Sequence, residues 1–460
     1  MDLRPGEVVR GVHPVGSCAV ERQYRGDGTP RQVEQRGQED RLLTTQWFVG
    51  IDWASDAHEV CVLDREGRVC ERRQVKHTAI ALQAFVDALL ARAQGDPATV
   101  AIGIEVPRGA LVELLVERGF AVYAINPKQL DRFRDRFTAA GAKDDRRDAL
   151  VVGDSLRTDP QAFRQVRLDQ PLIIQLREWS RVDEDLGVEL TRLTNQLRDL
   201  VYRSAPGLLA LCPAADEPWF WALLRDAPTP ADQQRLSQRR LERLLRTHRI
   251  RRLEAGQVHE VLQHAGVYTA PGVVEAVAAH LQLLLPRVDL IAAQRRDAER
   301  HLERLLDALE TEGIPAGDQR EHADVAIVRS MPGIGTRVAA RMLAEAPQPL
   351  VDRAYHVLRA TMGIAPVTKQ SGRRRTVSMR YACNVRLRNA GYHWARTGAQ
   401  KDPASRAYYA TLRARGHSHG RALRSVADRL LRVLMTLLTR GQVFDPNHGQ
   451  HSPVPVAAGA

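Results

Sequence analysis

The sequence has few cysteines, and their arrangement matches neither a disulfide framework nor a zinc site. The five cysteines are an odd number, are scattered along the chain and contain no pair at C-x2-C spacing. Structural disulfides and bound zinc are therefore not expected. They are Cys18, Cys61, Cys70, Cys212 and Cys383.

Long apolar stretches are also missing. No uninterrupted apolar run approaches the roughly 18 residues of a membrane span, and the N-terminus lacks the apolar core of a signal peptide. These absences predict a soluble, cytoplasmic protein with no membrane partner.

Aromatic residues are scarce, at 5% of the chain. Binding of nucleic acid by base stacking would therefore have few platforms, and contacts to backbone charge should dominate. The 67 lysines and arginines against 55 acidic residues give a net charge of +12. This balance favours a polyanionic partner, because basic side chains neutralise phosphates.

With 460 residues, the chain is long enough for two or three domains. Residues 1–45 are rich in Arg, Gly, Gln and Glu and show no apolar period, so we predict a disordered extension. Residues 166–320 show helical periodicity, which predicts a helical or coiled-coil linker and oligomerisation region. We predict that residues 321–445 form a mainly helical C-terminal domain and that residues 446–460 are a disordered tail.

The segment 46–165 has the pattern of an α/β domain. Short β-rich runs are followed by alternating helical and apolar strand patterns, in the order β-β-β-α-β-α-β. That order is typical of a ribonuclease-H-like (RuvC-like) mixed sheet. The predicted strands are Trp47–Asp52, Glu59–Asp64, Arg68–Val75, Thr99–Glu105 and Ala121–Ile125, and the predicted helices are Ala79–Ala93 and Gly109–Arg118.

Four carboxylates are placed where such a sheet would bring them together. Asp52 ends the first predicted strand and Glu105 the fourth, and these strands are neighbours in this fold. Asp145 and Asp148 are three residues apart at the start of a predicted helix, which puts them on one face. Converging carboxylates repel one another unless cations are present, and Mg²⁺ prefers oxygen ligands. Two such ions can promote phosphoryl transfer.

Ordinary explanations exist for each residue. A strand-end Asp is usually a turn former, and acidic residues in a first helical turn complement the helix dipole. Spacing does not choose between Asp144 and Asp145, because Asp144 and Asp148 also share a face. Gly50–Ser55 is similar to the first phosphate loop of actin-like sugar kinases, but a second phosphate loop and an adenosine loop are not found.

Two further segments suggest contacts to phosphate. Pro332-Gly333-Ile334-Gly335 looks like the hairpin of a helix-hairpin-helix motif, in which Gly333 and Gly335 would let backbone N–H groups approach phosphate. The alternative is a plain glycine turn. Ser371 precedes Gly372 and three arginines, Arg373, Arg374 and Arg375. Such a segment is ordinarily an exposed basic loop, yet arginines beside a hydroxyl also suit attack on a phosphodiester. The residues alone leave this choice open.

The chain resembles the DEDD transposases of the insertion-sequence 110 family, which are related to the Piv-type DNA invertases. The resemblance runs from about Phe48 to Pro446 and rests on the order and spacing of several short motifs. These motifs are Val49–Asp52, Ile104-Glu105, Lys143–Ala149, Met331–Gly335, Gly363–Pro366, Gln370–Gly372 and Arg421–Leu431.

The resemblance implies a function and a site. It selects Asp145 as the third carboxylate and Ser371 as a nucleophile that forms a covalent phosphoserine with DNA. It further implies Mg²⁺ as the cofactor and donor and target DNA as substrates. A structured non-coding guide RNA (bridge RNA) would select these DNAs by base pairing. Assembly into dimers and tetramers and a location with the nucleoid are also implied.

The chain departs from the family pattern in three places. Residues 1–45 precede the usual start, so the true start codon is expected downstream of Met1. Asp144 stands where many relatives have Thr or Asn. Cys383-Asn384 replaces a Gly-Asn pair, and the following Arg386 and Arg388 are interpreted as contacts to a nucleic-acid strand.

The sequence thus predicts a Mg²⁺-dependent, RNA-guided DNA transposase or recombinase. Two alternatives stay open. The first is a RuvC-like nuclease or junction resolvase that forms no covalent intermediate. The second is a non-catalytic nucleic-acid-binding protein, which the presence of all four carboxylates disfavours.

Overall fold

The computed structural model describes residues 44–134, 145–166, 169–267, 270, 272–311, 320–372 and 374–446. The chain separates into two compact units, Met1–Leu168 and Asp169–Ala460. Most of the predicted extension and the tail from residue 447 lie outside the described residues. Thr45, which we had placed in the extension, is buried, and its carbonyl accepts a 2.8 Å hydrogen bond from Arg65.

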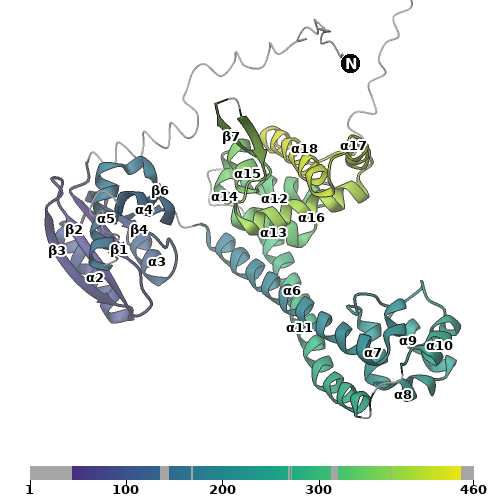
Figure 1. The fold of residues 1–460 in the computed structure, drawn as a ribbon. Coiled ribbons are helices and arrows are strands. Elements are labelled where there is room, and N and C mark those ends of the chain that lie inside the picture. The colour runs from purple at the N-terminus through teal and green to yellow at the C-terminus, as the bar shows by residue number, and fades with distance from the viewer. Residues whose placement is uncertain are drawn as a thin grey trace, which may run out of the picture. The chain divides into compact units, whose positions relative to one another are not determined.

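The first unit is built on one mixed six-stranded sheet in the order β3-β2-β1-β4-β5-β6 (Figure 1). Strand β1 pairs parallel with β4 and antiparallel with β2, and β5 continues the parallel part. The predicted mixed sheet is confirmed, and a short edge strand, β6, was not predicted. The strands are β1 (Trp47–Asp52), β2 (Ala57–Leu63), β3 (Val69–Lys76), β4 (Val100–Ile104), β5 (Ala121–Ile125) and β6 (Phe163–Gln165).

Helices cover both faces of this sheet, so its central strands are buried on both sides. On one face, apolar residues of α2 (Ala79–Arg92) and α3 (Ala110–Glu117) pack on the sheet in one core. On the other face, α4 (Pro127–Arg134) and α5 (Asp145–Thr158) contribute to a second core. This explains the nearly continuous apolar sequences of β1 and β4.

Glycines allow α5 to approach the sheet unusually closely. A Cβ atom on Gly50 of β1 would lie 1.9 Å from the carbonyl oxygen of Ala149 and 2.5 Å from the amide nitrogen of Gly153. A Cβ on Gly103 of β4 would lie 2.8 Å from a methyl group of Val152. Because these obstacles include the helix backbone, the helix can lie here only while β1 carries no side chain at position 50.

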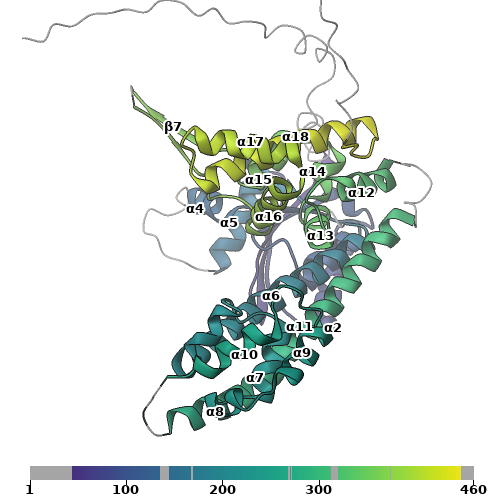
Figure 2. The same ribbon diagram turned by 90° about the vertical axis from the view of Figure 1, so that its right-hand side faces the viewer.

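The second unit contains two long helices, α6 (Pro171–Ser204) and α11 (Val273–Thr311), which lie side by side (Figures 1 and 2). The ring of Trp179 stacks on His301, and Glu189 lies 4.0 Å from Arg287. From the first contact to the second, the residue number increases in α6 and decreases in α11. The two helices are therefore antiparallel. The leucine periodicity of this region correctly predicts its helical character.

Between the two long helices the chain forms a cluster of short helices at one end of the pair (Figure 1). Its apolar residues pack with α6 and α11 in a separate core. By length and composition alone, helix α11 is also long and apolar enough to cross a membrane. The short helices are α7 (Pro218–Asp226), α8 (Pro230–Gln234), α9 (Gln238–Thr247) and α10 (Ala255–His264).

The C-terminal part of the second unit surrounds another core, to which α6 and α11 also contribute. A two-stranded hairpin of β7 and β8 extends from these helices (Figure 2). The elements are α12 (Arg320–Ser330), α13 (Thr336–Glu345), α14 (Pro347–Val351), α15 (Tyr355–Thr361), β7 (Val367–Ser371), β8 (Arg374–Ser378), α16 (Val385–Lys401), α17 (Pro403–Ala414) and α18 (His419–Arg440).

One buried carboxylate links the long helices to this part. Asp183 of α6 is 1% exposed and accepts a 2.8 Å hydrogen bond from Nε of Arg337 in α13. Arg295 of α11 and Arg341 of α13 lie 3.4 and 3.5 Å from its oxygens. A buried charge needs such partners, because an unpaired one is strongly destabilising. The three arginines therefore fix α6, α11 and α13 against one another.

We expect Gly50→Ala to destabilise the protein, because the new methyl group collides with the backbone of α5. Overpacking of this kind typically costs about 1–3 kcal/mol. Chemical denaturation monitored by circular dichroism would measure the change. Gly420→Ala is the matched control, since its Cβ would meet only the end of Arg424, at 3.7 Å. Equal stability of the Gly50 variant and the wild type would contradict the close packing.

Candidate active site

Two of the predicted carboxylates lie side by side at one edge of the sheet. In the parallel β1–β4 ladder, Ile51 pairs with Ile104. Asp52 and Glu105 directly follow these partners, so both project from the same ends of neighbouring strands, and both are half-buried. The carboxyl-terminal edge of parallel strands is where ligands of open α/β sheets bind. The expected neighbouring of these two strands is confirmed.

Helix α5, which packs on β1, carries the other two carboxylates in its first turn. Its contact with Gly50 of β1 runs through Ala149, the residue that follows Asp148. Asp148 is 3% exposed, whereas Asp145 is exposed in the first turn of α5. Asp144 lies outside the described residues, so the choice between Asp144 and Asp145 stays a prediction.

The carboxylates fit a hard divalent cation by their chemistry, since such ions prefer oxygen ligands. Asp52, Glu105, Asp145 and Asp148 are the residues that would hold it. Within the described residues, no three of them offer oxygens that all lie within 4.8 Å of one another. Like charges repel unless a cation neutralises them, so binding of an ion would draw these side chains inward.

A pair of histidines holds the turn that follows Asp52. The backbone N–H of Ala54 donates to Nδ1 of His58 at 3.3 Å, and Nε2 of His58 lies 2.8 Å from Nδ1 of His77. Burial lowers the pKa of His58, and the nearby His77 lowers it further. Since Nδ1 accepts a hydrogen bond, neutral His58 carries its proton on Nε2 and donates it to His77. We did not predict this pair, because a lone histidine in a strand has no distinctive spacing.

A second group of potential metal ligands lies elsewhere, in the second unit. Ligand atoms of Cys212, Asp216 and Glu217 all lie within 4.8 Å of one another. Glu217, however, accepts hydrogen bonds from Trp219 at 2.9 Å and from Arg252 at 2.7 Å. Burial raises the pKa of the Cys212 thiol, which keeps it protonated. This group is therefore accounted for by internal contacts.

Ser371 ends β7 beside the turn of the β7–β8 hairpin, where the sequence suggested a loop. It pairs directly with Arg374, whereas Gln370 pairs with Arg375. Directly opposed residues share a face of the ribbon and neighbouring ones alternate. Arg374 is thus on the face of Ser371, and Arg375 is on the other face. Arg373 lies outside the described residues. The turn uses Gly372 with a φ of +54°, as two-residue hairpin turns require.

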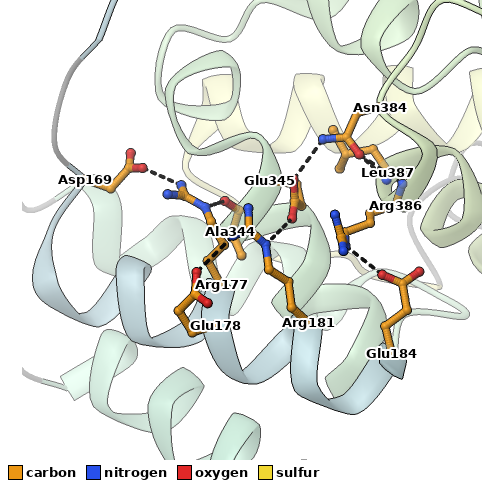
Figure 3. Close-up of polar contacts among 10 residues, drawn as sticks. All are labelled: Asp169, Arg177, Glu178, Arg181, Glu184, Ala344, Glu345, Asn384, Arg386 and Leu387. Atoms are coloured by element: carbon orange, nitrogen blue, oxygen red, sulfur yellow. Dashed lines mark hydrogen bonds and ion pairs between the residues drawn. The ribbon is translucent and has the colours of Figure 1, made fainter. Parts of the chain in front are cut away.

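The segment after the hairpin is joined to α6 and α13 by a polar network (Figure 3). The side-chain oxygen of Asn384 caps α16 by accepting from the amide of Arg386 at 2.9 Å, and its amide group donates to Glu345 at 2.8 Å. Arg386 itself is paired with Glu184 at 2.8 Å. Asn384 and Arg386 therefore have structural partners, which the sequence did not indicate.

Arg388 and the glycine turn also have identifiable surroundings. A guanidinium nitrogen of Arg388 lies 4.0 Å from the sulfur of Cys383. Gly333 has a φ of +85°, and a Cβ there would lie 2.5 Å from the backbone of Gly398. Glycine is therefore required at position 333 for the turn to pack against α16. Gly335 is exposed at the start of α13, with nothing near its Cβ position. Phosphate binding by Gly333, Gly335, Arg386 and Arg388 remains a prediction.

Comparisons with known proteins match both halves of the chain. Residues 49–206, which contain the four carboxylates, match a family model for DEDD transposases of the IS110 type, described as "Transposase". Residues 325–410, which contain Ser371, match a model described as "Transposase IS116/IS110/IS902 family".

Individual relatives agree with these matches. The "Mini-circle putative transposase for IS117" of Streptomyces coelicolor is 31% identical over 409 residues, which cover 86% of this chain and 95% of that protein. The "Insertion element IS110 uncharacterized 43.6 kDa protein" of the same species is 28% identical with 86% and 95% coverage. The "Putative transposase y4uE" of Sinorhizobium fredii is 47% identical over 211 residues, and the chain spans 58% of its length.

Substitution of Asn384 would test how the segment after the hairpin is anchored. Asn384→Ala removes the helix cap and the bond to Glu345, so amide exchange in the first turn of α16 should accelerate. Asn384→Ser keeps a capping oxygen but cannot reach Glu345 in the same way, and should preserve most of the protection. Hydrogen-exchange mass spectrometry of peptides spanning residues 380–392 measures both. Equal exchange in Asn384→Ala and the wild type would refute the capping role.

Proposed function

Because the chain belongs to the IS110 family of DEDD transposases, we propose that it moves DNA by cutting and rejoining strands with a carboxylate site and a serine nucleophile. The family assignment makes it an enzyme of DNA transposition, with DNA as substrate. The finer mechanism is the proposal: Mg²⁺ at Asp52, Glu105, Asp145 and Asp148, covalent catalysis by Ser371, and selection of DNA by a structured guide RNA.

One observation carries the carboxylate part of this proposal. Asp52 and Glu105 follow residues paired in a parallel ladder, and buried Asp148 lies next to Ala149, at the point where α5 contacts the backbone of β1. A turn-forming Asp or a dipole-complementing Asp needs no such convergence. The family typically uses a divalent metal, and these side chains supply only oxygen ligands, which favours Mg²⁺.

A cation held there would stabilise the charge that develops on phosphate oxygens during strand transfer. The contribution of the protein itself is to position the carboxylates. The parallel register fixes the two strand-end carboxylates, and the glycine contact fixes the depth of α5. His58 holds the turn after Asp52 by accepting a hydrogen bond from the backbone N–H of Ala54, and its own ring is held by His77. These restraints keep the ligands within reach of one phosphate.

We propose that Ser371 performs the covalent step. Its Oγ attacks phosphorus, an Oγ–P bond forms, and the bond from phosphorus to the oxygen of the departing strand breaks. The serine proton passes to solvent or a nearby base, and the departing oxygen leaves as a hydroxyl after taking up a proton. Attack by a hydroxyl of another strand reverses these changes and releases the serine, so no ATP is needed. Arg374, on the same face of the hairpin, can bind the non-bridging oxygens.

The proposal includes a guide RNA and self-association. The net charge of +12 is suited to a second polyanion beside DNA, and base pairing would then select sites without many protein contacts to bases. On α11, Leu283 and Leu290 are 74% and 56% exposed and lie seven residues apart, on one side of the helix. Such a pair of exposed leucines supports contact with a second copy of the chain.

We expect Asp52→Asn to abolish DNA cleavage in Mg²⁺ while leaving nucleic-acid affinity unchanged, because it removes a metal-ligand charge from a site that does not determine overall binding. Cleavage of labelled donor DNA and fluorescence anisotropy would measure the two properties. Asp87→Asn is the matched control, with the same charge change at an exposed surface pair with Arg118. Full wild-type turnover in EDTA would contradict the metal proposal.

We expect Ser371→Ala to abolish strand exchange and to leave RNA binding intact. The wild type should form a protein–DNA adduct that survives denaturation, and the variant should not. Ser378→Ala is the matched control, because Ser378 is an exposed serine at the other end of the same ribbon. If Ser371→Ala cuts DNA at the wild-type rate without an adduct, hydrolysis by a RuvC-like nuclease is the correct mechanism instead.

A further inference from the structure

The α9 surface, defined here as residues 235–252, is a strongly basic part of the short-helix cluster. It contains eight arginines and a single acidic residue, Glu242. Every one of these arginines is exposed. The segment contains no Phe, Tyr or Trp. It lies outside both matched family regions and contributes neither to the carboxylate site nor to the serine hairpin.

The packing of α9 explains why the charges face outward. Leu241 and Leu245 are buried in the core of the short-helix cluster. Arg239, Arg243 and Arg246 follow one another at spacings of four and three, so they form one stripe along the helix. With a rise of 1.5 Å per residue, the stripe extends over about 10 Å. That is close to the rise of about three base-pair steps in B-DNA.

Internal ion pairs do not account for the stripe. Arg240 pairs with Asp226 at 3.1 Å, and Arg252 pairs with Glu217 at 2.7 Å. In the described part of the chain, however, no carboxylate lies within 4.0 Å of the arginines of the stripe. The helix dipole favours Arg246, which is in the last turn of α9, but it does not account for Arg239, which is in the first turn, where a positive charge is unfavourable.

The turn after α9 adds two more arginines around a hollow. Arg246, Arg249 and Arg251 line an open depression of about 430 Å³, together with Glu242 and apolar residues that include Ile250. In the described structure, Arg249 and Arg251 likewise have no carboxylate within 4.0 Å. Three arginines around a depression that contains a single carboxylate leave an excess of positive charge, which is suited to an anion from outside the chain.

Arg249 is held in a backbone conformation that favours glycine. Its φ is +56°, at the position where a helix ends with a left-handed residue. The amide of Arg249 donates to Arg246 O at 3.1 Å, and that of Ile250 donates to Leu245 O at 2.9 Å. Glycine or asparagine is the usual choice there, because a larger side chain strains the backbone. Arginine stands there despite this strain, and its side chain lines the depression.

We propose that the α9 surface binds the phosphate backbone of duplex DNA. Arginine forks match phosphate oxygens bidentately, and the stripe is long enough to contact several phosphates. The absence of aromatic side chains disfavours single strands, whose bases need stacking partners. DNA is the substrate of the family, so this contact would hold DNA independently of both chemical sites and without reading its sequence.

The first test uses Arg239→Gln/Arg243→Gln/Arg246→Gln in the full-length protein. Fluorescence anisotropy with a 30-base-pair duplex of random sequence, in EDTA, gives Kd at several salt concentrations. The logarithm of the binding constant falls linearly with the logarithm of the salt concentration, and each lost phosphate contact should make this negative slope shallower by about 0.9. For the triple variant we therefore expect a slope that is shallower by about 2–3, and roughly tenfold weaker DNA binding near 0.15 M salt.

The matched control is Arg296→Gln/Arg300→Gln/Arg304→Gln on α11. These arginines are also exposed and similarly spaced, and the charge change is identical, but acidic residues such as Asp297 lie among them, with Arg300 paired to it. Binding should change by less than twofold. An equal loss in both triple variants would mean that only net charge matters and would overturn the proposal.

A second variant separates binding from folding. Arg249→Gly suits the left-handed conformation, so its unfolding midpoint should equal or exceed that of the wild type. The slope of its log K against log salt should nevertheless become shallower by about 1, because one phosphate contact is lost. Unchanged DNA binding in both Arg249→Gly and the stripe variant would refute the proposal. Loss of duplex RNA binding with unchanged DNA binding would also refute it, and would assign the surface to RNA.

These measurements do not depend on the covalent mechanism, because no strand is cut in EDTA. If Ser371→Ala retains full activity, the proposed chemistry fails while the binding result stands. If the stripe variant binds DNA normally, the proposal for the α9 surface fails. The experiments on Asp52 and Ser371 still test the proposed chemistry.

Discussion

The contact between the backbones of α5 and β1 is the constraint on which the candidate metal site depends. Gly50 leaves room for Ala149 and Gly153 to rest directly on the strand. A side chain at position 50 would push the helix away from the sheet, and Asp148 would move with it. The strand-end carboxylates are fixed separately by the parallel ladder. The site therefore arises from two independent backbone arrangements, one within the sheet and one between sheet and helix.

Much of the fold was predictable because it follows from periodicity. The apolar runs that became β1 and β4 are buried on both faces, and the leucine spacing of residues 186–200 survives in α6. Elements whose stability comes from tertiary context were missed. Strand β6 is three residues long, and its sequence Phe-Arg-Gln has no period to detect. The strands of the β7–β8 hairpin are almost wholly exposed and therefore lack the alternation that marks a half-buried strand.

In the candidate site too, residues placed by local sequence could be predicted, whereas contacts between distant segments could not. Asp52 and Glu105 could be predicted because each follows an apolar strand, and strand ends meet in a sheet. The proton arrangement of His58 and His77 could not, since it depends on a register between separate strands. Arg386 shows the opposite difficulty. A basic residue in a basic segment suggests a phosphate contact, but Glu184 lies about two hundred positions earlier in the chain and pairs with it. Pairing at that separation leaves no trace in local sequence.

The exposure of the β7–β8 hairpin has a consequence for the timing of catalysis. From Thr368 to Ser378 its described residues are exposed, so the ribbon has no core of its own. A two-stranded ribbon of this kind is only marginally ordered in water. If Ser371 is the nucleophile that we propose, it would reach its reactive geometry by docking onto a bound substrate, which would supply the missing packing surface. The proposed serine would thereby be kept from reacting in the unbound enzyme, and recognition of the correct DNA arrangement would be the step that starts its chemistry.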